Sequence, residues 1–375
     1  METLPHNLPC PSGASVKVSV LNNCFLRGVP TAPYVEPIIP GHGTFNDLPC
    51  LVFLIESSTG RKVLFDLGLR KDWHKLSPVS LSEIQNDEIE IKLKEDIVDI
   101  LKRERIAPGD IEAVVLRDIL IWAEYSHHHW DHVGDLSLFP DTTRVVVGPG
   151  FVDAFRLGYP DDDLAPLLAS DLSGKSVDEV NFEKASCVPL GPFTAFDYFG
   201  DGSFYIVDAP GHSIGHVGAL ARTTSNPDTF VFMGADSCHH CGEFRPSARR
   251  KTPSDFRLGS PTSGPSSPCR ELTSDDHKGP QGGLCGAPFY TITRDPRYAE
   301  YTHDHGAADA TIAKVQEMDG YDNVFVTMAH DDSIPEIVDM FPKTINEWKP
   351  KGWHEKGRWS FLKDFKGLAD VTRGS

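Results

Sequence analysis

The chain has 375 residues with 39% apolar side chains, 32 glycines and 29 prolines, a composition that excludes a fibre or coiled coil and indicates a globular protein with many loops. A net charge of −18 disfavours nucleic acid or an anionic membrane as a partner, because either would need a basic face. No run of about 18 apolar residues and no basic start followed by an apolar stretch is readable, so we expect a cytoplasmic protein without a membrane span. Eight dispersed cysteines favour reduced thiols.

Apolar and alternating segments predict the secondary structure in chain order. Strands are expected at residues 16–21, 51–55, 62–66, 111–116, 144–148, 203–208, 229–233 and 323–328. An amphipathic helix is expected over about 82–105, ending before Ala107-Pro108-Gly109. A strand-only beginning followed by mixed strands and helices predicts an α/β sandwich in which helices cover the outer faces of two sheets.

Three segments interrupt or extend this pattern within one predicted domain of residues 1–375. Residues 245–283 are rich in Ser, Pro, Gly and charge, so we expect a long surface loop or disordered insertion there. The aromatic residues of 351–365 favour a C-terminal helix packed on the core. Residues 117–125 separate the strand at 111–116 from the histidine run that follows, and this insertion determines how that run is aimed.

The run Ser126-His127-His128-His129-Trp130-Asp131-His132 is the densest cluster of potential metal ligands. His127 and His129 project from the same side of an extended segment, and a turn after them brings Asp131 and His132 towards the same point. Imidazole and carboxylate are the usual ligands of zinc. His128 and Trp130 are expected to face away from the metals, one outward and one into packing. Taken alone, the run leaves open an accidental His-rich stretch that binds metal only adventitiously.

Further candidate ligands follow predicted strands in order. His212 comes after 203–208, Asp236 after 229–233 and His330 after 323–328. His216 is expected to be a hydrogen-bonded core residue rather than a ligand. The run Cys238-His239-His240-Cys241 lacks a second cysteine pair at a suitable distance, so we expect it to line a pocket rather than to form a zinc knuckle.

The order His-x-His-x-Asp-His, Pro-Gly-His, Asp and final His resembles the metallo-β-lactamase superfamily over residues 16–350. The resemblance implies an αβ/βα four-layer sandwich with two mixed sheets and two Zn²⁺ per chain. It also implies a ligand set: His127, His129 and His212 for the first metal, Asp131, His132 and His330 for the second, Asp236 bridging them, and Asp66 supporting the ligands from behind.

Within the superfamily, the sequence resembles N-acyl homoserine lactonases, glyoxalase II and fungal lactonase/lactamase-like hydrolases. This implies a dizinc hydrolase that opens a lactone or lactam ring of a small secondary metabolite or xenobiotic with a metal-bridging hydroxide. Asp131 would return a proton. His239 stands where bacterial lactonases carry a tyrosine, three residues after the bridging aspartate, and could polarise the substrate. A thioesterase, a mononuclear-iron oxidoreductase and a non-catalytic member of the fold remain alternatives. The oligomeric state does not follow from the sequence.

Overall fold

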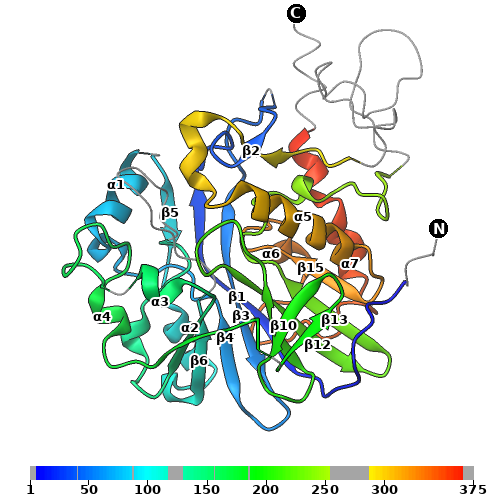
Figure 1. Cartoon of the computed structure of the whole chain (residues 1–375), viewed down its shortest axis with the longest axis horizontal. Coiled ribbons are helices and arrows are strands. Elements are labelled where there is room, and N and C mark those ends of the chain that lie inside the picture. The colour runs from blue at the N-terminus through cyan, green and yellow to red at the C-terminus, as the bar shows by residue number, and fades with distance from the viewer. Residues whose placement is uncertain are drawn as a thin grey trace, which may run out of the picture.

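The computed structural model describes residues 6–39, 41–86, 88–116, 130–155, 157–184, 186–253 and 287–365. Two large mixed sheets dominate these residues (Figure 1). The first sheet has the order β5 (Glu90–Leu93), β1 (Lys17–Arg27), β3 (Leu48–Glu56), β4 (Lys62–Phe65), β6 (Ile111–Val115), β7 (Arg144–Val147) and β8 (Val177–Glu179). The second has the order β15 (Val324–Thr327), β13 (Asp228–Met233), β12 (Val217–Ser225), β11 (Phe204–Asp208), β10 (Phe193–Asp197) and β9 (Cys187–Leu190).

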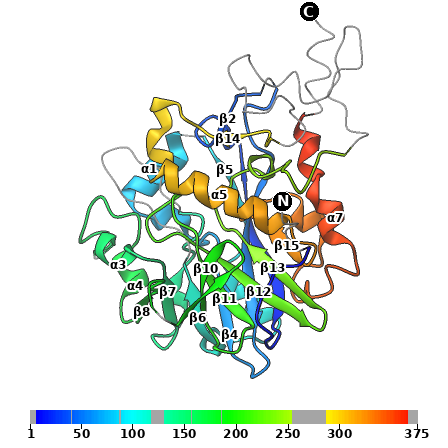
Figure 2. The same ribbon diagram turned by 45° about the vertical axis from the view of Figure 1, so that its right-hand side comes forward.

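The remaining elements lie around the two sheets. A small ribbon pairs β2 (Val35–Glu36) with β14 (Thr291–Ile292). The helices are α1 (Pro78–Asn86), α2 (Ile97–Arg103), α3 (Phe151–Ala154), α4 (Ala169–Leu172), α5 (His305–Asp319), α6 (Ile334–Ile337) and α7 (Trp353–Arg358). Figure 2 shows α5 lying across the strands β10 to β13. None of the described helices is long and apolar enough to cross a membrane.

The core follows the alternation of side chains along the strands. In β12, Ala219 and Ala221 face the first sheet and join a cluster with Phe53 and Val115, whereas Leu220 between them faces the opposite way and packs with α5. On the far side of the first sheet, α2 packs on residues of β3, β4 and β6. The layers are therefore helix, sheet, sheet and helix, which confirms the predicted sandwich.

The predicted helix over 82–105 is wrong in its middle. The α1 helix ends at Asn86, β5 then pairs antiparallel with Cys24–Arg27 of β1, and α2 begins only at Ile97. Glu88 has a φ of +53°, which no continuous helix tolerates. Ile89 and Ile91 alternate with charged residues, a period-two pattern that satisfies the open edge of β1 better than a helical turn would.

Three other predicted segments are placed as follows. The segment 351–365 forms α7 and a short 3₁₀ helix, Ser360–Phe365, which bury Trp353 and Phe365, so the helical C-terminal packing is confirmed in two pieces. Of the predicted loop 245–283, Arg245 is buried against Asp319, and residues 254–283 lie outside the described residues. The insertion 117–125 also lies outside them.

Candidate metal centre

The candidate site is built from the ends of strands in both sheets. Asp66 follows β4, His212 comes after β11, Asp236 after β13 and His330 after β15. Because β13 and β15 are parallel, and β11 runs in the same direction across β12, their carboxyl ends meet at one edge. Asp66 is within hydrogen-bonding distance of His132, and His132 in turn reaches Asp236 of the second sheet at this edge.

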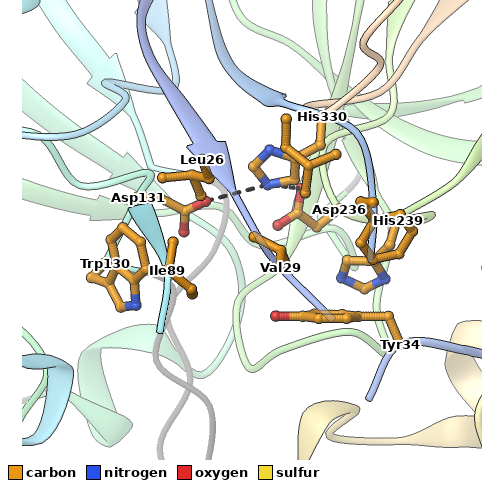
Figure 3. Close-up of a pocket in the computed structure, with 11 residues that line it drawn as sticks. Leu26, Val29, Tyr34, Ile89, Trp130, Asp131, Asp236, His239 and His330 are labelled. Carbon is orange, nitrogen blue, oxygen red and sulfur yellow. Dashed lines mark ion pairs between the residues drawn. The ribbon is translucent and has the colours of Figure 1, made fainter. Parts of the chain in front are cut away.

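The imidazoles and carboxylates of the site converge at short distances. The Nε2 atom of His132 lies 2.9 Å from Asp236 Oδ2 and 3.4 Å from Asp131 Oδ1. The Nε2 atom of His330 lies 3.4 Å from Asp131 Oδ2 and 3.6 Å from Asp236 Oδ1, as the dashed lines in Figure 3 mark. His212 Nε2 is 3.8 Å from Asp236 Oδ2. All five side chains are buried.

The hydrogen bonds behind His132 and His330 decide what their Nε2 atoms can do. A carbonyl oxygen can only accept, so His330 Nδ1 donates to Pro49 O at 2.8 Å. His132 Nδ1 lies 3.0 Å from Asp66 Oδ2 and can donate to it in the same way, and in the neutral form of each ring Nε2 then carries the lone pair that a metal would bind.

Ring nitrogens that face carboxylate oxygens at these distances call for a positive charge, which either a ring proton or a bound metal ion would supply. The donor set of imidazole nitrogens and aspartate oxygens is that of a divalent ion such as zinc, and the residues present therefore fit the metal site that the fold implies.

The backbone around the ligands is held in unusual conformations. Asp66 has a φ of +75° and its Oδ1 accepts from Gly68 N at 2.7 Å, which turns Oδ2 towards His132. Gly211 has a φ of +123°, and a Cβ there would lie 2.1 Å from Ala308 N of α5. Only glycine therefore allows the His212 loop to approach this helix so closely.

His216 supports the site without joining the ligands. Its Nδ1 donates to Ala209 O at 2.6 Å, and its Nε2 accepts from the backbone N–H of Asp236 at 3.2 Å. Both ring nitrogens are thus occupied by backbone groups, which confirms the prediction of a hydrogen-bonded core histidine. Its position fixes the residue that we expect to bridge the metals.

A pocket of about 430 Å³, partly open to solvent, lies directly over the carboxylates (Figure 3). Its wall is largely apolar and aromatic, and its lining residues are Leu26, Val29, Tyr34, Phe45, Leu48, Ile89, Trp130, Asp131, Asp236, His239 and His330. Trp130 is buried as predicted, but it contributes to the pocket wall instead of facing away from the site. Sequence reasoning missed Ile89 as a wall residue, since nothing in its local pattern indicates a ligand contact.

His239 lines the pocket together with the candidate ligands Asp236 and His330. Its ring centroid is 4.7 Å from that of His212 and 4.6 Å from that of Tyr34. Glu243 holds this turn, because its Oε2 accepts from the backbone N–H groups of His239 and His240 at 2.6 and 2.9 Å. Burial raises the pKa of Glu243 to about 8.

His127, His128 and His129 lie outside the described residues. For the first metal, the structure therefore places His212 and Asp236, and for the second it places Asp131, His132 and His330, with Asp236 between them. The assignment of individual ligands stays a prediction. What the described residues establish is a buried cluster of histidines and aspartates at the floor of a pocket.

Comparison with known proteins agrees with this architecture. Residues 45–219 match the family model of the metallo-beta-lactamase superfamily. The metallo-hydrolase mfmC of Annulohypoxylon moriforme is 40% identical over 96% of this chain and 90% of its own length, and the gamma-lactamase FDB1 of Fusarium pseudograminearum is 35% identical over 95% and 84%. The cytochrome P450 monooxygenase mpaDE of Penicillium roqueforti is 39% identical over 99% of this chain, which spans only 40% of that protein's length.

Solved structures share the fold at low sequence identity. A quorum-quenching N-acyl homoserine lactone lactonase superposes with a TM-score of 0.53 at 15% identity, covering 89% of this chain and all of that one. A second structure, of a quorum-quenching N-acyl homoserine lactone hydrolase, gives a TM-score of 0.52 at 16% identity, covering 90% of this chain and all of the other.

Fold and site together define the class of metal-dependent hydrolases with an αβ/βα sandwich. The chain belongs to the metallo-β-lactamase superfamily. The resemblance predicted from the histidine and aspartate motifs is thereby confirmed, as is a metal-dependent hydrolase at the level of the family.

Proposed function

We propose that this chain hydrolyses the lactone or lactam ring of a small, neutral and largely apolar compound, such as a secondary metabolite or xenobiotic, with two zinc ions. The observation that carries the proposal is the position of the pocket. An apolar cavity opens directly onto the carboxylates and imidazoles that would hold the metals, so a bound ring would lie against the reacting centre. A relative with 35% identity is named a gamma-lactamase, which agrees with this choice.

The chain's own residues would divide the work as follows. His127, His129 and His212 would hold one ion, Asp131, His132 and His330 the other, and Asp236 both. When bound, the ions would activate a water at neutral pH and polarise the carbonyl group.

Two further residues would act on the substrate from the pocket wall. His239 would donate a hydrogen bond to the carbonyl oxygen, because its ring lies beside His212 at the pocket wall. Asp131, which also lines the pocket, would return a proton to the leaving oxygen or nitrogen.

The charge of the pocket favours a ring substrate over a thioester of a glutathione-like carrier. Among the lining residues that the structure describes, none is a lysine or arginine, and the charged ones are Asp131 and Asp236. A substrate with several carboxylates would therefore meet no cation on this wall apart from the metals themselves. A neutral lactone or lactam needs none.

Metal content and a matched substrate panel test the proposal. We expect two zinc ions per chain, and faster hydrolysis of neutral aryl lactones or lactams than of a glutathione thioester. His132→Gln should lose metal and hydrolysis together. A protein that binds no zinc, one that carries a single iron, or one that prefers the thioester would overturn the proposal.

A further inference from the structure

Cys50 of β3 lies beside the position proposed for the second metal. It is fully buried, and one donor atom each from Cys50, Asp131 and His330 lie within 4.8 Å of one another. No part of the histidine and aspartate motif includes this thiol. It reaches the site because β3 passes behind the loop that carries His330.

Backbone contacts on both sides of Cys50 fix it relative to His330. The preceding residue, Pro49, accepts the hydrogen bond from His330 Nδ1 at 2.8 Å. The following residue, Leu51, donates its backbone N–H to Ala329 O at 3.2 Å. The strand and the ligand loop are therefore joined at the two positions that flank Cys50, and these bonds hold the backbone of Cys50 beside His330.

We infer that Cys50 supplies a sulfur ligand to the second metal, an inference that rests on the proposed function. Ligand atoms around one zinc ion lie roughly 3–4 Å apart, so a small side-chain adjustment brings the thiol, the carboxylate and the imidazole onto one ion. The bound ion would displace the thiol proton and hold the sulfur as a thiolate. Such a site selects zinc, cobalt or cadmium over magnesium or manganese, because thiolates are soft ligands.

Cys24 of β1 provides a matched control. It is as deeply buried as Cys50, and the two strands pair at Phe25 and Pro49, next to both cysteines. Among the described residues, Cys24 belongs to none of the groups that could hold a metal. The two side chains are hydrogen-bonded to each other, and Cys24→Ser keeps a hydroxyl for that bond, so this variant removes one sulfur from the same core without removing the proposed ligand.

Replacing zinc with cobalt tests directly whether sulfur is bound to the metal. We expect the cobalt-loaded wild type and Cys24→Ser to show a thiolate-to-cobalt charge-transfer band in the near ultraviolet, and Cys50→Ser to lack it while keeping the ligand-field bands of bound cobalt. A wild type that binds cobalt without that band, or a band of full strength in Cys50→Ser, would overturn the inference.

X-ray absorption of the zinc-loaded wild type needs no variant and keeps the inference testable if Cys50→Ser does not fold. We expect a sulfur scatterer at about 2.3 Å from zinc. Two bound ions with only nitrogen and oxygen neighbours would refute the sulfur ligand and leave the proposed function standing. A chain that binds neither zinc nor cobalt would refute both.

Discussion

Two buried histidine–aspartate pairs in this molecule look alike and differ in what they can bind. His132 Nδ1 lies 3.0 Å from Asp66, and His240 Nε2 lies 3.1 Å from Asp364. The second pair, together with His42, has the ligand spacing of a metal site, and so has His132 of the first pair with Asp236 and His330. His239, next to His240 of the second pair, lines the pocket over the metal site as well as the pocket beside Asp364.

The second nitrogen of each imidazole ring distinguishes the two pairs. His240 Nδ1 accepts the backbone N–H of Gly242 at 2.9 Å, so both nitrogens of this ring are used, and Asp364 also accepts from Asn46 at 2.6 Å. His132 instead uses one nitrogen for Asp66 and turns its Nε2 towards Asp131 and Asp236, the carboxylates of the proposed metal site. A hydrogen-bond account therefore distinguishes a structural pair from a ligand pair where spacing does not.

The largest difference between the two pairs is expected when the same substitution is made in each histidine. His132→Gln removes a proposed ligand, and we expect it to lower kcat/KM by at least about 100-fold with loss of bound metal. His240→Gln keeps a donor for Asp364, so activity should stay within a few-fold of the wild type. Metal analysis and hydrolysis rates measured on both variants check this, and equal losses in the two would contradict it.

Replacing the aspartate behind each histidine should give a smaller difference between the two pairs. Asp66→Ala frees the ring of His132 and should weaken zinc binding by about 10–100-fold in a chelator competition. Asp364→Ala should leave zinc affinity unchanged but lower the free energy of unfolding by about 1–3 kcal/mol, because His240 and Asn46 lose a buried acceptor. Reduced zinc affinity in Asp364→Ala would show that the two pairs are equivalent after all.

Replacing Glu243, which holds the turn at His239 and His240, should have the smallest effect on catalysis but should change how stability depends on pH. Its pKa rises from an ordinary 4.5 to about 8 in the folded chain, so the folded state holds the proton more tightly and stability falls as pH rises between these values. Glu243→Gln still accepts from His239 N and His240 N and does not titrate.

The variant should therefore gain stability over the wild type from about pH 4.5 to about pH 8, by a few kcal/mol in all, and show no further change above. Denaturant unfolding of both proteins across this range measures the difference. A difference that does not vary with pH would mean that Glu243 is ionised throughout.

The sequence by itself determined the sandwich and the order of the ligands. Local apolar patterns predict strands such as β11, β13 and β15. Because His212, Asp236 and His330 follow these strands at short intervals, their order as ligands can be predicted without tertiary information. The one failed element, 82–105, contains β5, whose pairing partner on β1 lies more than 60 residues earlier in the chain.

Only the tertiary structure decided which residues surround the metals. Tyr34, Ile89 and Cys50 come from separate segments, and no periodicity marks them as neighbours of His330. Which ring nitrogen of His132 and His330 carries the proton depends on Asp66 and on the carbonyl of Pro49, and both partners are distant in the sequence. Ligand type is a local property of the sequence, whereas the pocket wall and the hydrogen bonds behind each ligand arise from contacts between distant strands.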